Sequence, residues 1–106
     1  MRSDVSEVFS ALADDTRRAI YEQILSHPSG LTATELARSA SVSRQAIVKH
    51  LQLLDGAGLA RALREGREVR YVALARGADQ ATQWLLEHSA AWDRRIAALQ
   101  KKAGGN

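Results

Sequence analysis

The stretch from residue 31 to residue 59 constrains the fold of this chain most strongly. It opens with the sequence T-A-T-E, a capping box in which the Thr32 hydroxyl accepts from the Glu35 amide and the Glu35 carboxylate accepts from the Thr32 amide. This box predicts a short helix that begins at Ala33 and ends near residues 39–41. Ser43 then caps a second helix, which ends at the sequence G-A-G. Two short helices joined by a tight polar turn are therefore expected.

The second of these helices has two different faces. Ala46, Ile47, Leu51 and Leu54 recur at the spacing of a core-facing stripe. The side chains that this spacing directs outward are mostly polar or basic: Arg44, Gln45, Val48, Lys49 and Gln52. One face can therefore pack on a core while the other stays available to a partner.

After residue 59 the apolar residues alternate with a period of two, which predicts a β-hairpin over about residues 59–74. Its expected turn contains Gly66, and Arg64, Arg67 and Arg70 make its tip strongly basic.

Helices are predicted at both ends of the chain. In the first, Val5, Val8, Phe9 and Leu12 follow the i, i+3, i+4, i+7 spacing of one stripe. A second helix follows before residue 27, and the last helix covers about residues 79–101. At roughly 20 residues it spans about 30 Å, so part of its apolar face should extend beyond the core.

These elements predict a mainly α fold with a small β-hairpin, in the order α-α-α-α-β-β-α, which is the plan of a winged helix-turn-helix. The length of 106 residues suits a single domain over residues 1–106, with the helix-turn-helix at about 32–55. No cysteine, P-loop, GxGxxG or credible Ser/His/acid set is present, so an enzyme and a cofactor are not expected. No secretory or membrane-spanning segment is evident, so a cytoplasmic protein without a membrane partner is expected.

The positive charge of the chain is unevenly distributed. Residues 31–76 hold eight basic and four acidic residues, a balance of +4, whereas the remainder holds seven basic and eight acidic residues, a balance of −1. Such a local excess is typical of a surface that binds a polyanion, although chance clustering on a solvated face would look similar. Combined with the predicted fold, it favours double-stranded DNA as the partner.

The major groove admits one α-helix, whose first-turn side chains reach the base edges. Arg44 can bridge guanine O6 and N7, and Gln45 can bridge adenine N6 and N7. Val48 either packs on a thymine methyl group or is simply partly buried. The side chains better suited to phosphates are Thr32, Ser43, Lys49 and His50, with Arg64, Arg67 and Arg70 on the wing.

The run VSRQAIVKHLQLLDGAGL, with SALADDTRRAIYEQIL before it and REGREVRYVAL after it, resembles the ArsR/SmtB family of bacterial winged-helix repressors. The resemblance covers roughly residues 4–100. It implies a homodimeric transcriptional repressor of a palindromic operator, with dimer contacts from the first and last helices. The interface residues expected on those helices are Val5, Val8, Phe9, Leu12, Trp84, Leu85, His88, Trp92, Ile96 and Leu99.

The chain departs from the metal-sensing members of that family. Glu35-Leu36-Ala37 stands where their cysteine pair would fall, and His88 is the only histidine of the last helix. No metal site is therefore expected, and any small-molecule inducer is unknown. Trp84 and Trp92 fit the interface better than a ligand pocket. Two alternatives stay open: a ligand- or metal-gated sensor with its site at the dimer interface, and a winged-helix protein-interaction module that does not read DNA.

Overall fold

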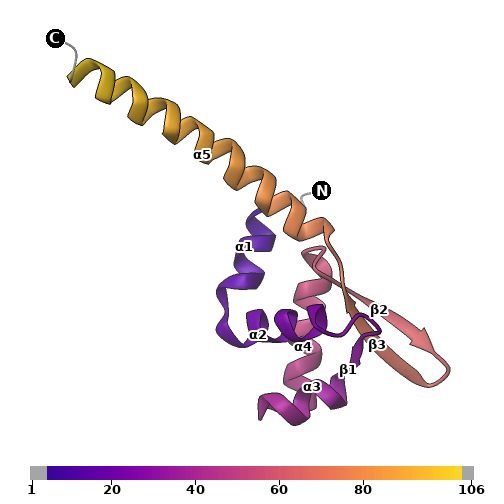
Figure 1. Cartoon of the computed structure of the whole chain (residues 1–106). Coiled ribbons are helices and arrows are strands. Elements are labelled where there is room, and N and C mark those ends of the chain that lie inside the picture. The colour runs from indigo at the N-terminus through magenta and orange to yellow at the C-terminus, as the bar shows by residue number, and fades with distance from the viewer. Residues whose placement is uncertain (1–4, 104–106) are drawn as a thin grey trace.

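The computed structural model describes residues 5–103, which form five helices and three short strands (Figure 1). In chain order they are α1 (Val5–Ala13), α2 (Asp15–Leu25), β1 (Leu31–Thr32), α3 (Ala33–Ala40), α4 (Arg44–Gly56), β2 (Ala60–Glu65), β3 (Glu68–Ala73) and α5 (Arg76–Ala103). This is a winged helix-turn-helix, with α3 and α4 as the helix pair and β2–β3 as the wing. The predicted order is confirmed except for one additional strand.

Capping chemistry sets the ends of α3 and α4. The Glu35 amide donates to the Thr32 hydroxyl over 3.1 Å, and the Thr32 amide donates to the Glu35 carboxylate over 2.9 Å, which completes the predicted capping box. The Ser43 hydroxyl accepts from the Ala46 amide over 3.0 Å. Between the two helices, Ser41 adopts the left-handed conformation with φ 58° and turns the chain. The tight turn of the motif is therefore set by local features, which are the left-handed Ser41 and the cap at Ser43.

The sheet has a strand that the alternation pattern did not reveal. It is antiparallel, in the order β1-β3-β2, and in it Leu31 pairs with Tyr71 and Thr32 with Arg70. The prediction of a two-stranded hairpin is therefore incomplete, because a strand of two residues is too short to show a period of two. The pairing also places Arg70 in the central strand, so its predicted position at the tip of the wing is wrong.

The core packs against the inner face of α4, and all of its large, fully buried side chains are aliphatic. Its fully buried large side chains are Val8, Ile20, Ile24, Leu36, Ile47, Leu51, Leu54 and Leu59. Val8 has an exposed fraction of 0%, so its predicted role in a dimer interface is wrong: its side chain is used within the subunit. Val5 and Leu12 pack at the edge of the same core, whereas Phe9 remains exposed.

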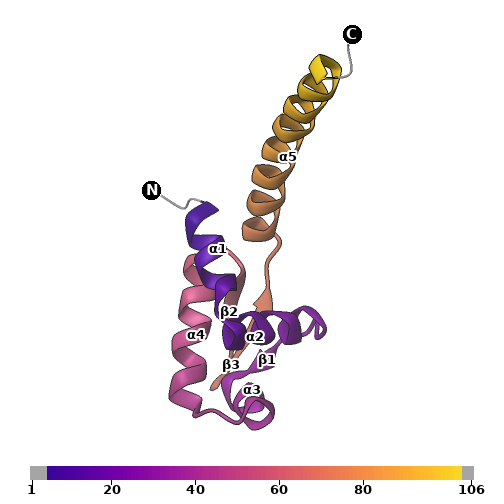
Figure 2. The ribbon, with the colours of Figure 1, turned by 90° about the vertical axis from the view of Figure 1, so that its left-hand side faces the viewer.

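Helix α5 leaves the body beside α1 and extends far beyond it (Figures 1 and 2). The described residues measure 70 × 28 × 23 Å, and their radius of gyration of 18.6 Å exceeds the roughly 13 Å of a compact domain of this length. The 28-residue helix begins at Arg76, earlier than predicted. None of the described helices is long and apolar enough to span a membrane.

A glycine fixes the start of α5 against the end of α4. The Gly77 amide donates to the Gly58 carbonyl over 2.8 Å, and a Cβ at Gly77 would lie only 2.5 Å from the Ala57 carbonyl oxygen. Only glycine permits this close approach. The direction in which α5 leaves the body is therefore tied to the end of α4.

Candidate nucleic-acid interface

The first turn of α4 presents an exposed polar surface. Ile47 and Leu51 hold the opposite face of the helix in the core, which leaves Arg44 and Gln45 exposed. The Arg44 Nε donates to the Thr34 hydroxyl of α3 over 3.3 Å. This bond connects the guanidinium to the neighbouring helix and limits the directions in which it can point.

A groove of about 590 Å³ runs between this turn, α3 and the wing. Arg38 of α3, Arg44 of α4 and Arg67 of the wing all line it, so three separate elements contribute cations to one surface. Val48 lines the same groove while packing against the core, which fits both of the roles considered for it. Glu35 and Glu68 also line the groove, and a carboxylate oxygen of each lies within 4 Å of Arg70. The three arginines can hold a polyanion against the first turn of α4.

The candidate residues named from the sequence did not include Arg38 and Thr34. Both line the groove, and they lie four residues apart on the exposed side of α3. Residues four apart lie on the same face of a helix, so this spacing in the sequence could have identified both as candidates.

The tip of the wing is a tight turn with two exposed cations. Gly66 has φ 63°, and the last strand pair before the turn joins Glu65 to Glu68. Within residues 5–103, no carboxylate lies within 4 Å of the guanidinium of Arg64 or Arg67. Both side chains are therefore available to phosphates.

Arg70 has a different environment. Its side chain is only 23% exposed, and its two terminal nitrogens lie 3.7 Å from a Glu35 carboxylate oxygen and 3.8 Å from one of Glu68. Its charge is largely offset within the subunit. A direct phosphate contact by Arg70 would have to compete with these two carboxylates.

The capping carboxylate is stabilised in its ionised form. The hydrogen bond from the Thr32 amide lowers the pKa of Glu35 below its ordinary value of 4.5, and the nearby charge of Arg70 acts in the same direction. Asp14 caps α2 by accepting from the Arg17 amide, which likewise lowers its pKa. In both cases the folded chain favours the charged carboxylate.

These lowered pKa values predict a dependence of stability on acid. Between the folded and unfolded pKa values of Glu35, the unfolded chain binds more protons than the folded chain. The contribution of the Glu35 carboxylate to the free energy of unfolding is therefore complete above about pH 4.5 and is lost as pH falls through the folded pKa. Glu35→Gln keeps an acceptor for Thr32 but removes the titration. Urea unfolding between pH 3 and pH 6 is expected to show a shallower pH dependence for Glu35→Gln than for the unmodified chain.

A matched control is Glu22→Gln, because the Glu22 carboxylate accepts no hydrogen bond within residues 5–103. It removes a carboxyl group of α2 without touching the capping box, so an effect shared by both variants would not be due to the Glu35 cap. Equal slopes for Glu35→Gln and the unmodified chain would contradict the role assigned to the capping carboxylate.

The two remaining predicted contacts of α4 lie in different surroundings. Lys49 is exposed, whereas His50 is partly buried on the side of α4 that faces α2. The His50 Nδ1 lies 3.2 Å from the Arg17 Nη1. Because a guanidinium only donates, Nδ1 accepts and Nε2 carries the ring proton. A phosphate contact by His50 stays a prediction and would have to use Nε2.

The predicted interface residues of α5 form a stripe that begins at the body and continues past it. Trp84 packs edge-on against Phe9 of α1 at 5.6 Å and stacks on His88 at 3.8 Å. Farther along, Leu85, Trp92, Ile96 and Leu99 are exposed. The His88 Nδ1 lies 2.8 Å from the Trp84 carbonyl. Among residues 5–103, no group of three or more His, Cys, Asp or Glu side chains is placed to hold a metal ion.

Comparison with known proteins places the chain among transcriptional regulators. Residues 12–62 match a family model described as a helix-turn-helix domain. Over 73 residues the chain is 40% identical to the uncharacterised HTH-type transcriptional regulator YuzN of Bacillus subtilis, a match that covers 63% of this chain and 78% of YuzN.

Two solved structures are similar over most of the molecule. An ArsR-like transcriptional regulator from Rhodococcus sp. RHA1 has a TM-score of 0.85 and 38% identity, covering 96% of this chain and 94% of its own. The homodimeric winged helix-turn-helix DNA-binding domain Mb0332 of Mycobacterium bovis, a possible ArsR-family regulator, has a TM-score of 0.63 and 26% identity, covering 82% of this chain and 77% of its own.

Proposed function

The chain belongs to the ArsR family of winged helix-turn-helix transcriptional regulators, and we propose that within this family it acts as a homodimeric repressor of an inverted-repeat operator. As a DNA-binding regulator it would act in the cytoplasm, where bacterial DNA is found. The observation that carries the proposal is the groove at the exposed first turn of α4, to which α3, α4 and the wing each contribute one arginine.

The exposed stripe of α5 supports the dimer. Its large apolar side chains lie on a helix that extends beyond the rest of the structure, as Figure 1 shows, and the side chain of Trp92 is 62% exposed. Contiguous apolar surface of this kind usually marks a protein interface. A second copy that contributes the same stripe would cover it by two-fold symmetry. The homodimeric state of Mb0332 is consistent with this arrangement.

In such a dimer, each α4 would enter one of two successive major grooves, about 34 Å apart. Arg44 and Gln45 would read base edges from the first turn. Ser43, Thr32 and Lys49 would contact the flanking phosphates, together with the wing arginines. This division makes the groove between α3, α4 and the wing the source of both affinity and sequence preference.

Selection of bound fragments from a genomic DNA library at physiological salt tests the proposal. Enriched fragments are expected to share an inverted repeat whose half-sites are about 10 base pairs apart from centre to centre. A winged-helix module that binds only other proteins would enrich no sequence, and that result would overturn the proposal.

Repression is tested by transcription in vitro from a template on which the selected site overlaps the promoter. Adding the protein is expected to lower transcript yield. An increase in yield would contradict the assignment as a repressor.

Arg67→Ala is expected to weaken binding to every DNA sequence by a similar factor, because the wing contacts phosphates rather than bases. The slope of log affinity against log salt should fall in magnitude by about one. Fluorescence anisotropy with the selected site and a scrambled duplex across a salt series measures both quantities. Arg94→Ala, which removes an exposed cation of α5 outside the groove, is the matched control and should change neither. A loss confined to the selected site would instead assign Arg67 to base reading.

A further inference from the structure

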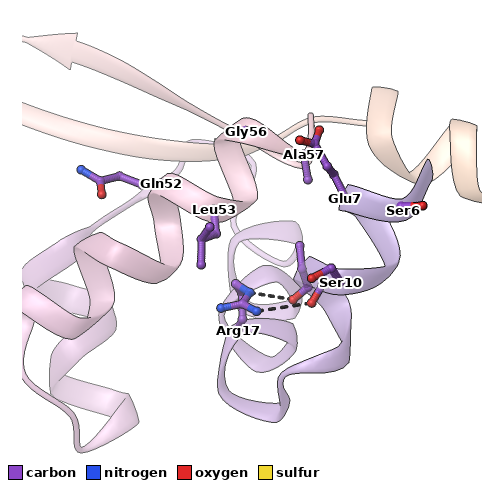
Figure 3. A pocket seen from close by; sticks show the side chains of 9 residues that line it. Ser6, Glu7, Ser10, Arg17, Gln52, Leu53, Gly56 and Ala57 are labelled. Atoms are coloured by element: carbon purple, nitrogen blue, oxygen red, sulfur yellow. Dashed lines mark hydrogen bonds between the residues drawn. The ribbon is translucent and has the colours of Figure 1, made fainter. Parts of the chain in front are cut away.

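A second cavity lies away from the groove, between α1 and the C-terminal half of α4 (Figure 3). Its volume is about 380 Å³. Ala11, Leu53 and Ala57 give it an apolar wall, and Ser10, Arg17 and Gln52 supply polar groups. Leu53 is 54% exposed, and Figure 3 shows its side chain directed into the same space as that of Arg17. We call this space the α1–α4 cleft.

Arg17 connects three elements at the edge of the α1–α4 cleft. Its Nε donates to the Ala11 carbonyl over 2.7 Å, and its Nη2 donates to the Ser10 carbonyl over 3.3 Å. Its Nη1 donates to the His50 Nδ1 of α4 over 3.2 Å. A guanidinium has five N–H groups, so these bonds leave one on each terminal nitrogen.

All three acceptors of the Arg17 side chain are uncharged. Within residues 5–103, no carboxylate oxygen lies within 4 Å of its guanidinium. Asp14 accepts from the backbone amide of Arg17, and the Arg17 guanidinium acts on the Asp14 carboxylate only through the longer-range attraction that helps to lower the Asp14 pKa. A partly buried cation whose side-chain hydrogen bonds all go to uncharged acceptors can still pair with an anionic ligand, because its charge is less screened than that of an exposed cation.

Glu7 is the only other ionisable residue that lines the α1–α4 cleft, and it is exposed to solvent. Water screens its charge better than it screens that of Arg17, but Glu7 would still repel a second negative charge on a ligand. The cleft therefore suits a monoanion with a compact apolar body, which would pack against Leu53 and Ala57.

We propose that the α1–α4 cleft binds a small monocarboxylic acid, whose carboxylate pairs with Arg17, and that this binding weakens DNA reading by α4. The second part rests on the proposed function. A carboxylate would compete with Ser10, Ala11 and His50 for the Arg17 N–H groups. Because Arg17 holds the end of α1 to α4, weakening these bonds would loosen the placement of the reading helix relative to the dimer.

The binding test uses benzoate as the probe and the full chain. Titration followed by amide NMR is expected to shift resonances of residues 6–11 and 52–57, with a dissociation constant on the order of millimolar. Benzyl alcohol, which has a similar body without the charge, should bind at least about tenfold more weakly. No shift in these segments at a tenfold higher benzoate concentration would overturn the site.

Two charge variants form a matched pair. Arg17→Gln removes the cation of the cleft, whereas Arg18→Gln removes its neighbour, which also donates to a carbonyl at the end of α1, that of Leu12. Arg18 does not line the cleft. Benzoate affinity is expected to fall at least about tenfold for Arg17→Gln and to stay unchanged for Arg18→Gln. Equal affinities for the two variants would contradict the pairing with Arg17.

A third variant fills the cleft while keeping Arg17. Gly56 lines the cleft, and a Cβ built there meets nothing within 4 Å, so a side chain can start at this position without a clash, and Gly56→Leu adds apolar volume at the cleft. It is expected to abolish the benzoate shifts while its remaining NMR spectrum stays that of the folded chain. Undiminished benzoate binding by folded Gly56→Leu would place the ligand elsewhere.

The coupling is tested by measuring affinity for the selected operator with and without saturating benzoate. A weakening of about tenfold is expected for the unmodified chain and none for Gly56→Leu. Benzoate binding without any change in operator affinity would overturn the coupling. If the protein bound no operator at all, the proposed function would fail, while the benzoate shifts would still support the site.

Discussion

Trp92→Glu is expected to convert the protein to a monomer at micromolar concentration. Trp92 lies at the middle of the exposed stripe of α5 and is its most exposed aromatic residue. In a two-fold interface the substitution occurs twice, so two carboxylates would lose water close to each other. Burying unpaired charge of this kind costs about 3–5 kcal/mol, which corresponds to a factor of at least 100 in dimer affinity.

Sedimentation equilibrium measures this outcome directly, because the chain mass is 11.6 kDa and the dimer has twice that mass. Ala97→Glu is the matched control: it adds the same charge to the same part of α5, on the face away from Trp92. It should remain a dimer. A dimeric Trp92→Glu variant would show that the stripe of α5 is not the interface.

Arg44→Ala is expected to reduce affinity for the selected operator by about 1–3 kcal/mol, or roughly 5- to 150-fold. The loss on a scrambled duplex of the same length should be much smaller, since the bidentate contact to a guanine exists only at the operator. Competition binding at one fixed salt concentration gives both losses.

Arg38→Ala is the informative comparison, because Arg38 lines the same groove but projects from α3 rather than from the first turn of α4. It is expected to weaken both duplexes alike. If Arg44→Ala also weakened both alike, the assignment of Arg44 as a base reader would be wrong.

The features that could be predicted from the sequence depend on neighbouring residues. The starts of α3 and α4 follow from the caps Thr32 and Ser43, each of which binds an amide three residues further on, and both starts are confirmed. The overhang of α5 follows from its length alone. In each case one segment of the chain contains all of the necessary information.

The features that were missed depend on residues far apart in sequence. Strand β1 exists because Leu31 meets Tyr71, and Arg70 is drawn into the sheet by the same pairing. Val8 was assigned to an interface because periodicity identifies an apolar stripe but not which neighbour covers it. In the folded chain its side chain is fully buried in the core of the subunit.

The α1–α4 cleft likewise could not be predicted from the sequence. Arg17 and His50 are 33 positions apart, and their contact depends on how α2 packs against α4. A sequence shows Arg17 as one of two adjacent arginines on a helix. The structure distinguishes them, because Arg18 reaches an aspartate while Arg17 has uncharged acceptors only.

The ratio of affinities for the selected operator and for a scrambled duplex of equal length and composition tests DNA reading by α4 most directly. At physiological salt, with both duplexes competing for the unmodified full chain, a ratio of about 1,000 or more is expected for sequence-specific recognition. A ratio near one would contradict sequence reading by α4. It would show that the basic groove binds DNA without regard to its sequence.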